Sequence, residues 1–143
     1  NPSLVGSEMC IRDSDSGVLI GFGSDCVMDP WYSLGKADML DVAFMGLHVG
    51  QLSSREDMAW CFDAITSNSA TIMHLEDYGI SVGSKANFNL LQAKNTIEAI
   101  RLRAHRLAVV RSGKLIAGNT PLNTELHIQG RPHFVDPASY APN

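Results

Sequence analysis

Residues 17–35 have the sequence GVLIGFGSDCVMDPWYSLG, which joins a short apolar run to a polar segment. The apolar part, residues 17–22, begins and nearly ends with glycine, and this pattern predicts a strand buried on both faces, as in a parallel sheet or barrel. Ser24, Asp25 and Cys26 follow at once. Because the loops at the carboxyl ends of strands carry the chemistry in α/β architectures, we expect functional residues in this segment.

The residues that come next predict helices packed against a larger body. Residues 37–52 are apolar around most of a helical surface, which predicts a buried helix that ends at Gly50. Ser53 and Glu56 have the spacing of a capping box, so a second helix is expected to begin there. A third, short helix is predicted over residues 69–75. The polar residues of the first helix, which we expect to face outward, are Asp38, Asp41 and His48.

The second half of the chain changes from helical to alternating patterns. Residues 86–90 alternate apolar and polar side chains, which predicts a strand, and residues 96–103 predict a helix. Residues 107–117 predict a hairpin with its turn at 112–113. Residues 119–143 contain four prolines, and we expect an extended segment with little structure of its own.

The composition is that of a folded globular chain. The 143 residues include 11 basic and 15 acidic side chains, for a net charge of −4, and 45% of them are apolar. A nucleic-acid binder that works by bulk positive charge is therefore excluded, and a hydrophobic core can form. A complete eight-stranded α/β barrel needs about 250 residues, so barrel features in this chain would indicate a part of one.

The sequence predicts a cytoplasmic protein without a membrane partner. No stretch approaches about 18 consecutive apolar residues, and the start lacks the layout of a signal peptide. The cysteines, Cys10, Cys26 and Cys61, are odd in number and have no C-x-x-C spacing. This excludes a disulfide framework and a zinc ribbon, and it favours a reducing compartment.

The opening segment has no amphipathic period and joins abruptly to the apolar run that follows it. Residues 1–14 resemble the translated read-through of a sequencing adapter. We interpret residues 1–16 as a non-native segment and exclude them from the fold prediction, which removes Cys10 from any argument about chemistry.

Several blocks of the sequence resemble the C-terminal part of bacterial cytosine deaminases, which belong to the metal-dependent amidohydrolase superfamily. The block at residues 23–35 is the specific one. The resemblance covers essentially everything from Gly17 to the C-terminus. The supporting blocks are residues 37–40 and 45–49, and, more weakly, residues 77–87 and 110–116, which look like the strand pair that closes the small β domain of the superfamily.

The resemblance implies an α/β fold. It would consist of the C-terminal part of a (β/α)8 amidohydrolase barrel, namely its last strand and helices, together with part of the flanking β-sandwich domain. The domains implied are residues 1–16 as the non-native segment, 17–75 as the end of the barrel, 76–118 as part of the β-sandwich and 119–143 as an extended C-terminal tail.

The resemblance also implies the site. At the place of Asp25 the family has the aspartate that binds the catalytic metal and carries the proton of the attacking water. One divalent metal ion, iron or zinc, is implied, since such an ion lowers the pKa of bound water to about 7 and an adjacent carboxylate can accept its proton. Trp31 would line the pocket of the base, where a flat heterocycle gains from stacking. Cys26 stands where the best-known cytosine deaminases carry a second acidic residue that touches the pyrimidine.

The rest of the family's active site has no counterpart in this sequence. Its H-x-H pair, its later metal-binding histidine and its acid/base residues would all lie upstream of Gly17. A catalytic zinc normally takes three protein ligands, and Asp25 supplies one. We therefore predict that this polypeptide alone is inactive.

The predicted function is metal-dependent hydrolysis of cytosine to uracil and ammonia in the complete parent enzyme. The predicted partner is a small-molecule nucleobase substrate. Whether the complete enzyme is a homo-oligomer is left open by the sequence. The alternative substrate is another cyclic amidine, such as isocytosine, creatinine or a triazine. A non-catalytic remnant is the alternative of another class, and it predicts a stable, monomeric, cooperative fold without the rest of the barrel.

Each site residue also has a plain structural interpretation. Without the family, Asp25 is a turn residue after a strand. Asp29 and Pro30 combine an N-cap with the residue favoured at the first helical position, so they predict a short helical turn. Trp31 fits a core position as well as a pocket wall. Cys26 fits a small buried side chain better than a nucleophile, because neither His nor Lys neighbours it in the sequence.

Overall fold

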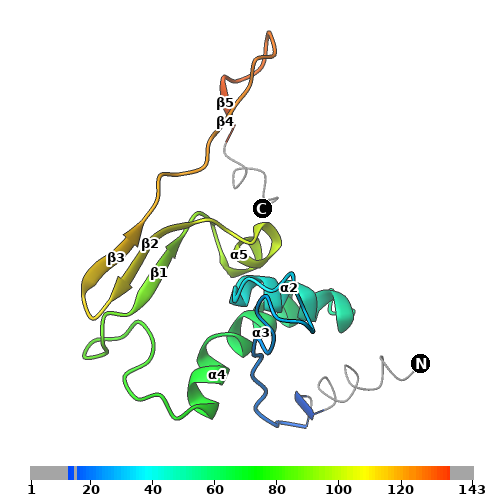
Figure 1. Cartoon of the computed structure of the whole chain (residues 1–143), viewed down its shortest axis with the longest axis vertical. Helices are drawn as coiled ribbons and strands as arrows, with labels where there is room; N and C mark the ends of the chain where they lie inside the picture. Colours follow the sequence, from blue (N-terminus) through cyan, green and yellow to red (C-terminus); the bar gives the residue numbers. More distant parts are fainter. Residues whose placement is uncertain (1–12, 15, 136–143) are drawn as a thin grey trace. The chain divides into compact units, whose positions relative to one another are not determined.

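The computed structural model describes residues 13, 14 and 16–135. The chain divides into two compact units, Asn1–Tyr78 and Gly79–Asn143. The first contains helices α2, α3 and α4, and the second contains helix α5 and strands β1 to β5 (Figure 1). The fold is thus mixed α/β. The interpretation of residues 1–16 as non-native falls mostly outside the described residues.

Helix α2, Met39–Val49, is the helix predicted over residues 37–52. It begins two residues later than expected, because Asp38 is its N-cap and accepts a hydrogen bond from the Leu40 amide at 3.0 Å. Gly50 ends the helix as predicted. Asp38, expected on the outward polar stripe, is half-buried just before the helix, where its carboxylate satisfies a free N–H group of the first turn.

Helix α3, Arg55–Ala64, has its N-cap at Ser54, one residue later than the predicted N-cap Ser53. The box is formed by Ser54 and Asp57, each side chain bonding the backbone N–H of the other residue. Helix α4, Ser67–Ile72, starts two residues before the expected position. The core of this unit is made mainly of small side chains that let the helices approach closely: Leu40, Ala43, Cys61, Ala64 and Ala70.

The predicted strand at residues 17–22 is not formed. Residues 18–22 are extended but have no ladder partner among the described residues. Instead, the Phe22 amide donates to the Ala64 carbonyl at 2.8 Å, and the Asn68 side-chain amide donates to the Ile20 carbonyl at 3.0 Å. A strand exists only where a neighbour exchanges backbone hydrogen bonds with it, and here α3 and α4 take that place.

The ring of Phe22 anchors this extended segment to the helices. It packs against Gly46 of α2, where an added Cβ would lie 2.7 Å from its Cε2 atom. It also meets the ring of Trp60 edge to face, with centroids 5.5 Å apart. The polar residues that follow Phe22 are thereby held beside α2.

The second unit contains an antiparallel sheet in the order β1-β2-β3. Strand β1, Phe88–Leu91, lies within two residues of its prediction, and β2, Arg106–Arg111, and β3, Lys114–Gly118, form the predicted hairpin. Ser112 and Gly113 at its turn both have positive φ, 49° and 73°, as a type I′ turn requires. Farther on, β4, Thr124–Glu125, pairs with β5, Phe134–Val135.

Helix α5, Thr96–Leu102, confirms the helix predicted over residues 96–103. Its N-cap Asn95 accepts a hydrogen bond from the Glu98 amide at 2.9 Å. The Glu98 side chain is buried, and its two oxygens accept hydrogen bonds from the Arg101 guanidinium at 2.9 and 2.6 Å. This paired contact, above all its hydrogen bond, holds the pKa of Glu98 below its usual range.

The ion pair of Glu98 predicts a loss of stability in acid. A carboxyl whose pKa is lower in the folded state stabilises that state above its unfolded pKa, and the contribution is lost as the pH falls through the folded pKa. Urea unfolding of the second unit, followed by the backbone signals of β1 to β3, should therefore give a lower midpoint at about pH 3 than at about pH 7. Glu98→Gln should flatten this dependence. An equal pH dependence in the variant would contradict the assignment to Glu98.

Candidate functional site

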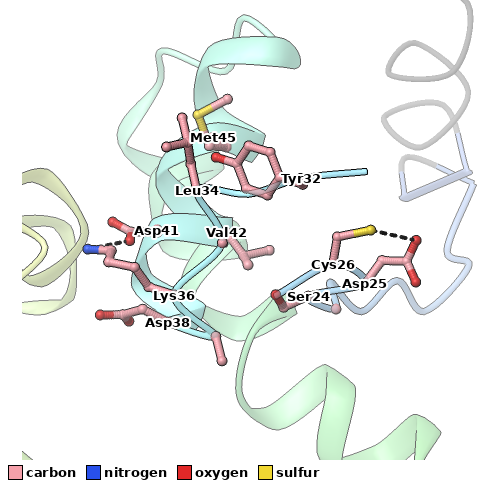
Figure 2. Close-up of a pocket in the computed structure, with 13 residues that line it drawn as sticks. Ser24, Asp25, Cys26, Tyr32, Leu34, Lys36, Asp38, Asp41, Val42 and Met45 are labelled. Atoms are coloured by element: carbon pink, nitrogen blue, oxygen red, sulfur yellow. Dashed lines mark hydrogen bonds and ion pairs between the residues drawn. The ribbon is translucent and has the colours of Figure 1, made fainter. Parts of the chain in front are cut away.

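A pocket of about 360 Å³ lies in the first unit, between the segment around Asp25 and the first turns of α2. Figure 2 shows Asp25 and Cys26 at one end of it and the ion pair of Lys36 with Asp41 at the other. The pocket is lined by Gly23, Ser24, Asp25, Cys26, Tyr32, Leu34, Gly35, Lys36, Ala37, Asp38, Asp41, Val42 and Met45.

The walls of the pocket differ in character. Leu34, Val42 and Met45 supply apolar surface, and the last two lie on one face of α2 at helical spacing. The Lys36 ammonium lies 2.6 Å from an Asp41 carboxylate oxygen, so the two charges are paired with each other. An apolar wall with a few polar groups at its edges is the usual composition of a pocket for a small molecule.

Asp25 and Cys26 point toward one another at the pocket edge. The Cys26 Sγ atom lies 3.8 Å from Oδ2 of Asp25 (Figure 2). Hydrogen bonding with the Asp29 carboxylate, then partial burial, then the negative charge of Asp25 all raise the pKa of the Cys26 thiol. Cys26 is therefore a neutral thiol near neutral pH, which is the poorly nucleophilic form.

The segment from Asp29 to Tyr32 forms a bend and not the predicted helical turn. Asp29 still acts as a cap: its Oδ1 atom accepts hydrogen bonds from the amides of Trp31 and Tyr32, both at 2.9 Å. These bonds, that from Tyr32 first, lower the pKa of Asp29 against an opposing effect of burial. Asp29 thus makes the hydrogen bonds of an N-cap, although no helix follows it directly.

The structure brings together only part of the predicted site. Asp25 and Cys26 line the pocket, whereas Trp31 is 88% exposed and does not. The role of Trp31 at a base pocket stays a prediction. Tyr32, Lys36 and Asp41 line the pocket and were not expected there. Asp41 belongs to the polar residues of the helix that the sequence singled out. Its ion pair with Lys36, however, could not be predicted from the sequence.

A metal centre needs more ligands than the described residues bring together. In the part of the chain that the structure describes, no three His, Cys, Asp or Glu side chains gather so that they could hold a metal ion. Since a catalytic zinc takes three protein ligands, Asp25 fits one ligand of such a centre and the described residues do not fit the whole. Within the same residues, no helix has the length and hydrophobicity of a membrane span.

Comparison with known proteins gives a consistent result. The model of the family described as "Amidohydrolase family" matches residues 13–121. N-isopropylammelide isopropyl amidohydrolase from Pseudomonas sp. (strain ADP) is 32% identical over 107 residues, which are 74% of this chain and 27% of that protein.

Solved structures give the same picture. The crystal structure of 5-methylcytosine deaminase from Klebsiella pneumoniae liganded with 5-fluorocytosine has a TM-score of 0.77 and 33% identity, over 82% of this chain and 29% of the other. N-isopropylammelide isopropylaminohydrolase from Burkholderia multivorans ATCC 17616 has a TM-score of 0.71 and 29% identity, over 74% and 27%. The chain thus spans less than a third of the length of these relatives.

Proposed function

Because this chain belongs to the amidohydrolase family, we propose that it contributes to a hydrolase that converts cytosine to uracil and ammonia. The observation that carries the proposal is the match to 5-methylcytosine deaminase, at 33% identity over 82% of the chain. It is supported by the position of Asp25 at the edge of a pocket with the usual composition for a small molecule.

In this proposal Asp25 is the proton carrier. Water adds to the ring carbon that bears the amino group, and its proton passes to the Asp25 carboxylate. The carboxyl then gives this proton to the departing nitrogen, the C–N bond breaks, and ammonia leaves. The second proton of the water moves from the new hydroxyl group to the unprotonated ring nitrogen, so that the carbonyl of uracil forms. Such a carboxylate at a reacting group contributes about 10²- to 10⁴-fold to the rate.

The other proposed roles follow from the chemistry of each group. Cys26, kept neutral by its surroundings, is a wall of the base pocket. Trp31 is exposed in this chain and would offer its face for stacking on the ring in the complete enzyme. We also propose one divalent metal ion, iron or zinc, with Asp25 as one of its ligands. Such an ion lowers the pKa of the attacking water.

A second candidate substrate is favoured by a specific observation. Both N-isopropylammelide hydrolases match this chain over 74% of its length. The same C–N hydrolysis on a triazine such as N-isopropylammelide is therefore the alternative, and isocytosine and creatinine extend it to other cyclic amidines. Cys26 leaves these choices open, because it stands where the best-known cytosine deaminases carry an acidic residue that touches the pyrimidine.

A chimaeric enzyme tests the proposal. Residues 13–121, the part that matches the family, replace the aligned segment of the K. pneumoniae 5-methylcytosine deaminase. We expect the purified chimaera to release ammonia from cytosine and from 5-methylcytosine. Its kcat/KM for these substrates should exceed that for ammonia release from isocytosine or creatinine and that for isopropylamine release from N-isopropylammelide. The unmodified host enzyme is the control for assay and metal loading.

Two outcomes would count against cytosine. A chimaera that prefers N-isopropylammelide would assign the segment to the triazine alternative. A chimaera that is folded by circular dichroism and loaded with metal, yet releases neither ammonia nor isopropylamine from any of the substrates, would contradict the proposed function altogether.

A further inference from the structure

The segment that carries Asp25 is closed on itself by a backbone contact. Gly35 is buried, and a Cβ atom added to it would lie 2.3 Å from the carbonyl oxygen of Cys26 and 3.0 Å from the Cα atom of Val27. Distances below 3.0 Å are not found for real Cβ atoms, so any other residue at position 35 must displace the backbone of Cys26. The requirement is for space, because the contact is with main-chain atoms that cannot rotate away.

A second contact closes the same loop from its middle. The carboxylate of Asp29 accepts hydrogen bonds from the amides of Trp31 and Tyr32, both at 2.9 Å. It therefore fixes the turn through which the chain passes from Cys26 to Gly35. Both residues would shape the loop without touching a substrate.

The two contacts act on one loop. Gly35 lies against the Cys26 carbonyl, and Asp29 fixes the turn at Trp31 and Tyr32. Cys26 in turn contacts Asp25, Sγ to Oδ2, at 3.8 Å. After Gly35 the chain continues through Lys36 to Asp38, the N-cap of α2. The loop is therefore connected directly to a rigid element.

We propose that Gly35 and Asp29 are positioning residues that together hold the Asp25–Cys26 pair at the pocket edge. This inference rests on the proposed role of Asp25, because positioning matters to the reaction only if that carboxylate takes part in it. A shift of about 1 Å at a reacting group can cost on the order of 10²-fold in rate. Gly35 would then be required at its position although it has no functional group.

Alkylation of Cys26 measures the position of this loop without any turnover. The full 143-residue chain is used with Cys10→Ser, and iodoacetamide is added at a pH high enough to ionise the Cys26 thiol in every variant. The rate, read by mass spectrometry of the Cys26 peptide, then reports how well the loop shields the sulfur. Cys61, which is fully buried, serves as the folding control, since it reacts only when the unit opens.

Matched variants separate the two contacts from general effects. Gly35→Ala should raise the rate at Cys26 by about tenfold, which corresponds to about 1.4 kcal/mol of lost local protection. Gly23→Ala is its control, since a Cβ added at Gly23 meets nothing within 4 Å. Asp29→Ala should also raise the rate, whereas Asp29→Asn should restore it, because an amide oxygen accepts the same two N–H bonds.

Wild-type rates in both Gly35→Ala and Asp29→Ala, with Cys61 protected, would overturn the inference. Asp29→Asn as reactive as Asp29→Ala would overturn the part of Asp29. If Gly35→Ala exposes Cys61, that variant is unfolded. The comparison of Asp29→Ala with Asp29→Asn then tests the inference. None of these results bears on turnover, so failure here is distinct from failure of the proposed function, which the chimaeric enzyme reports.

Discussion

Asp25→Asn in the chimaeric enzyme is expected to lower kcat by about 10²- to 10⁴-fold, the range in which a positioned acid or base contributes to catalysis. An asparagine keeps the size and the hydrogen-bonding oxygen of the side chain but cannot accept the proton of water. It also removes the negative charge from the pocket edge, where Asp25 contacts Cys26 at 3.8 Å. The measurement is ammonia release from cytosine, with kcat and KM determined separately.

The matched control for this change is Asp63→Asn. Asp63 is an exposed carboxylate of α3 that does not line the pocket, and it accepts a local hydrogen bond from the Ser67 hydroxyl at 3.4 Å. The control should retain the kcat of the parent chimaera. If Asp25→Asn retained kcat as well, with full metal occupancy, the role of Asp25 as proton carrier would have to be abandoned.

The second large effect concerns the polypeptide of 143 residues by itself. With added zinc or iron, it should show no turnover of cytosine above the rate of free metal. The reason is the ligand set: the described residues gather no three metal-binding side chains, and Asp25 supplies only one of the ligands that a catalytic ion needs. Ammonia release and the absorbance of uracil provide independent readouts.

A positive control for that assay is the chimaeric enzyme at the same metal concentration. Turnover that stays with the purified chain and disappears in its Asp25→Asn variant would contradict the prediction. It would mean that residues outside the described part complete the metal centre.

Many of the helix ends and turns could be predicted from local sequence patterns. Gly50 ends α2, the turn at residues 112–113 forms with positive φ, and α5 lies where it was expected. Errors in these elements were of one or two residues, as with the capping box that Ser54 forms in place of Ser53. Caps and turns depend on groups a few residues apart, so neighbours in the sequence contain the necessary information.

The candidate site was predicted less completely. Asp25 and Cys26 line the pocket, whereas Trp31 is exposed and Tyr32 takes a place in the wall. The two residues are adjacent and both aromatic, so no periodicity separates them. Which one faces the pocket depends on how Asp29 turns the backbone, and that turn is a bend where a helix was expected.

The sequence by itself determined the family, the helices of the first unit and the hairpin of the second, because each depends on local patterns or on a specific block such as residues 23–35. Only the tertiary structure decided what residues 18–22 bond to, and which side chains form the pocket. An apolar run has the same sequence whether its backbone pairs with a strand or with the ends of two helices, as Phe22 does with Ala64. The pairing of Lys36 with Asp41, and the space that only Gly35 leaves beside Cys26, likewise arise from contacts between segments that are brought together by folding.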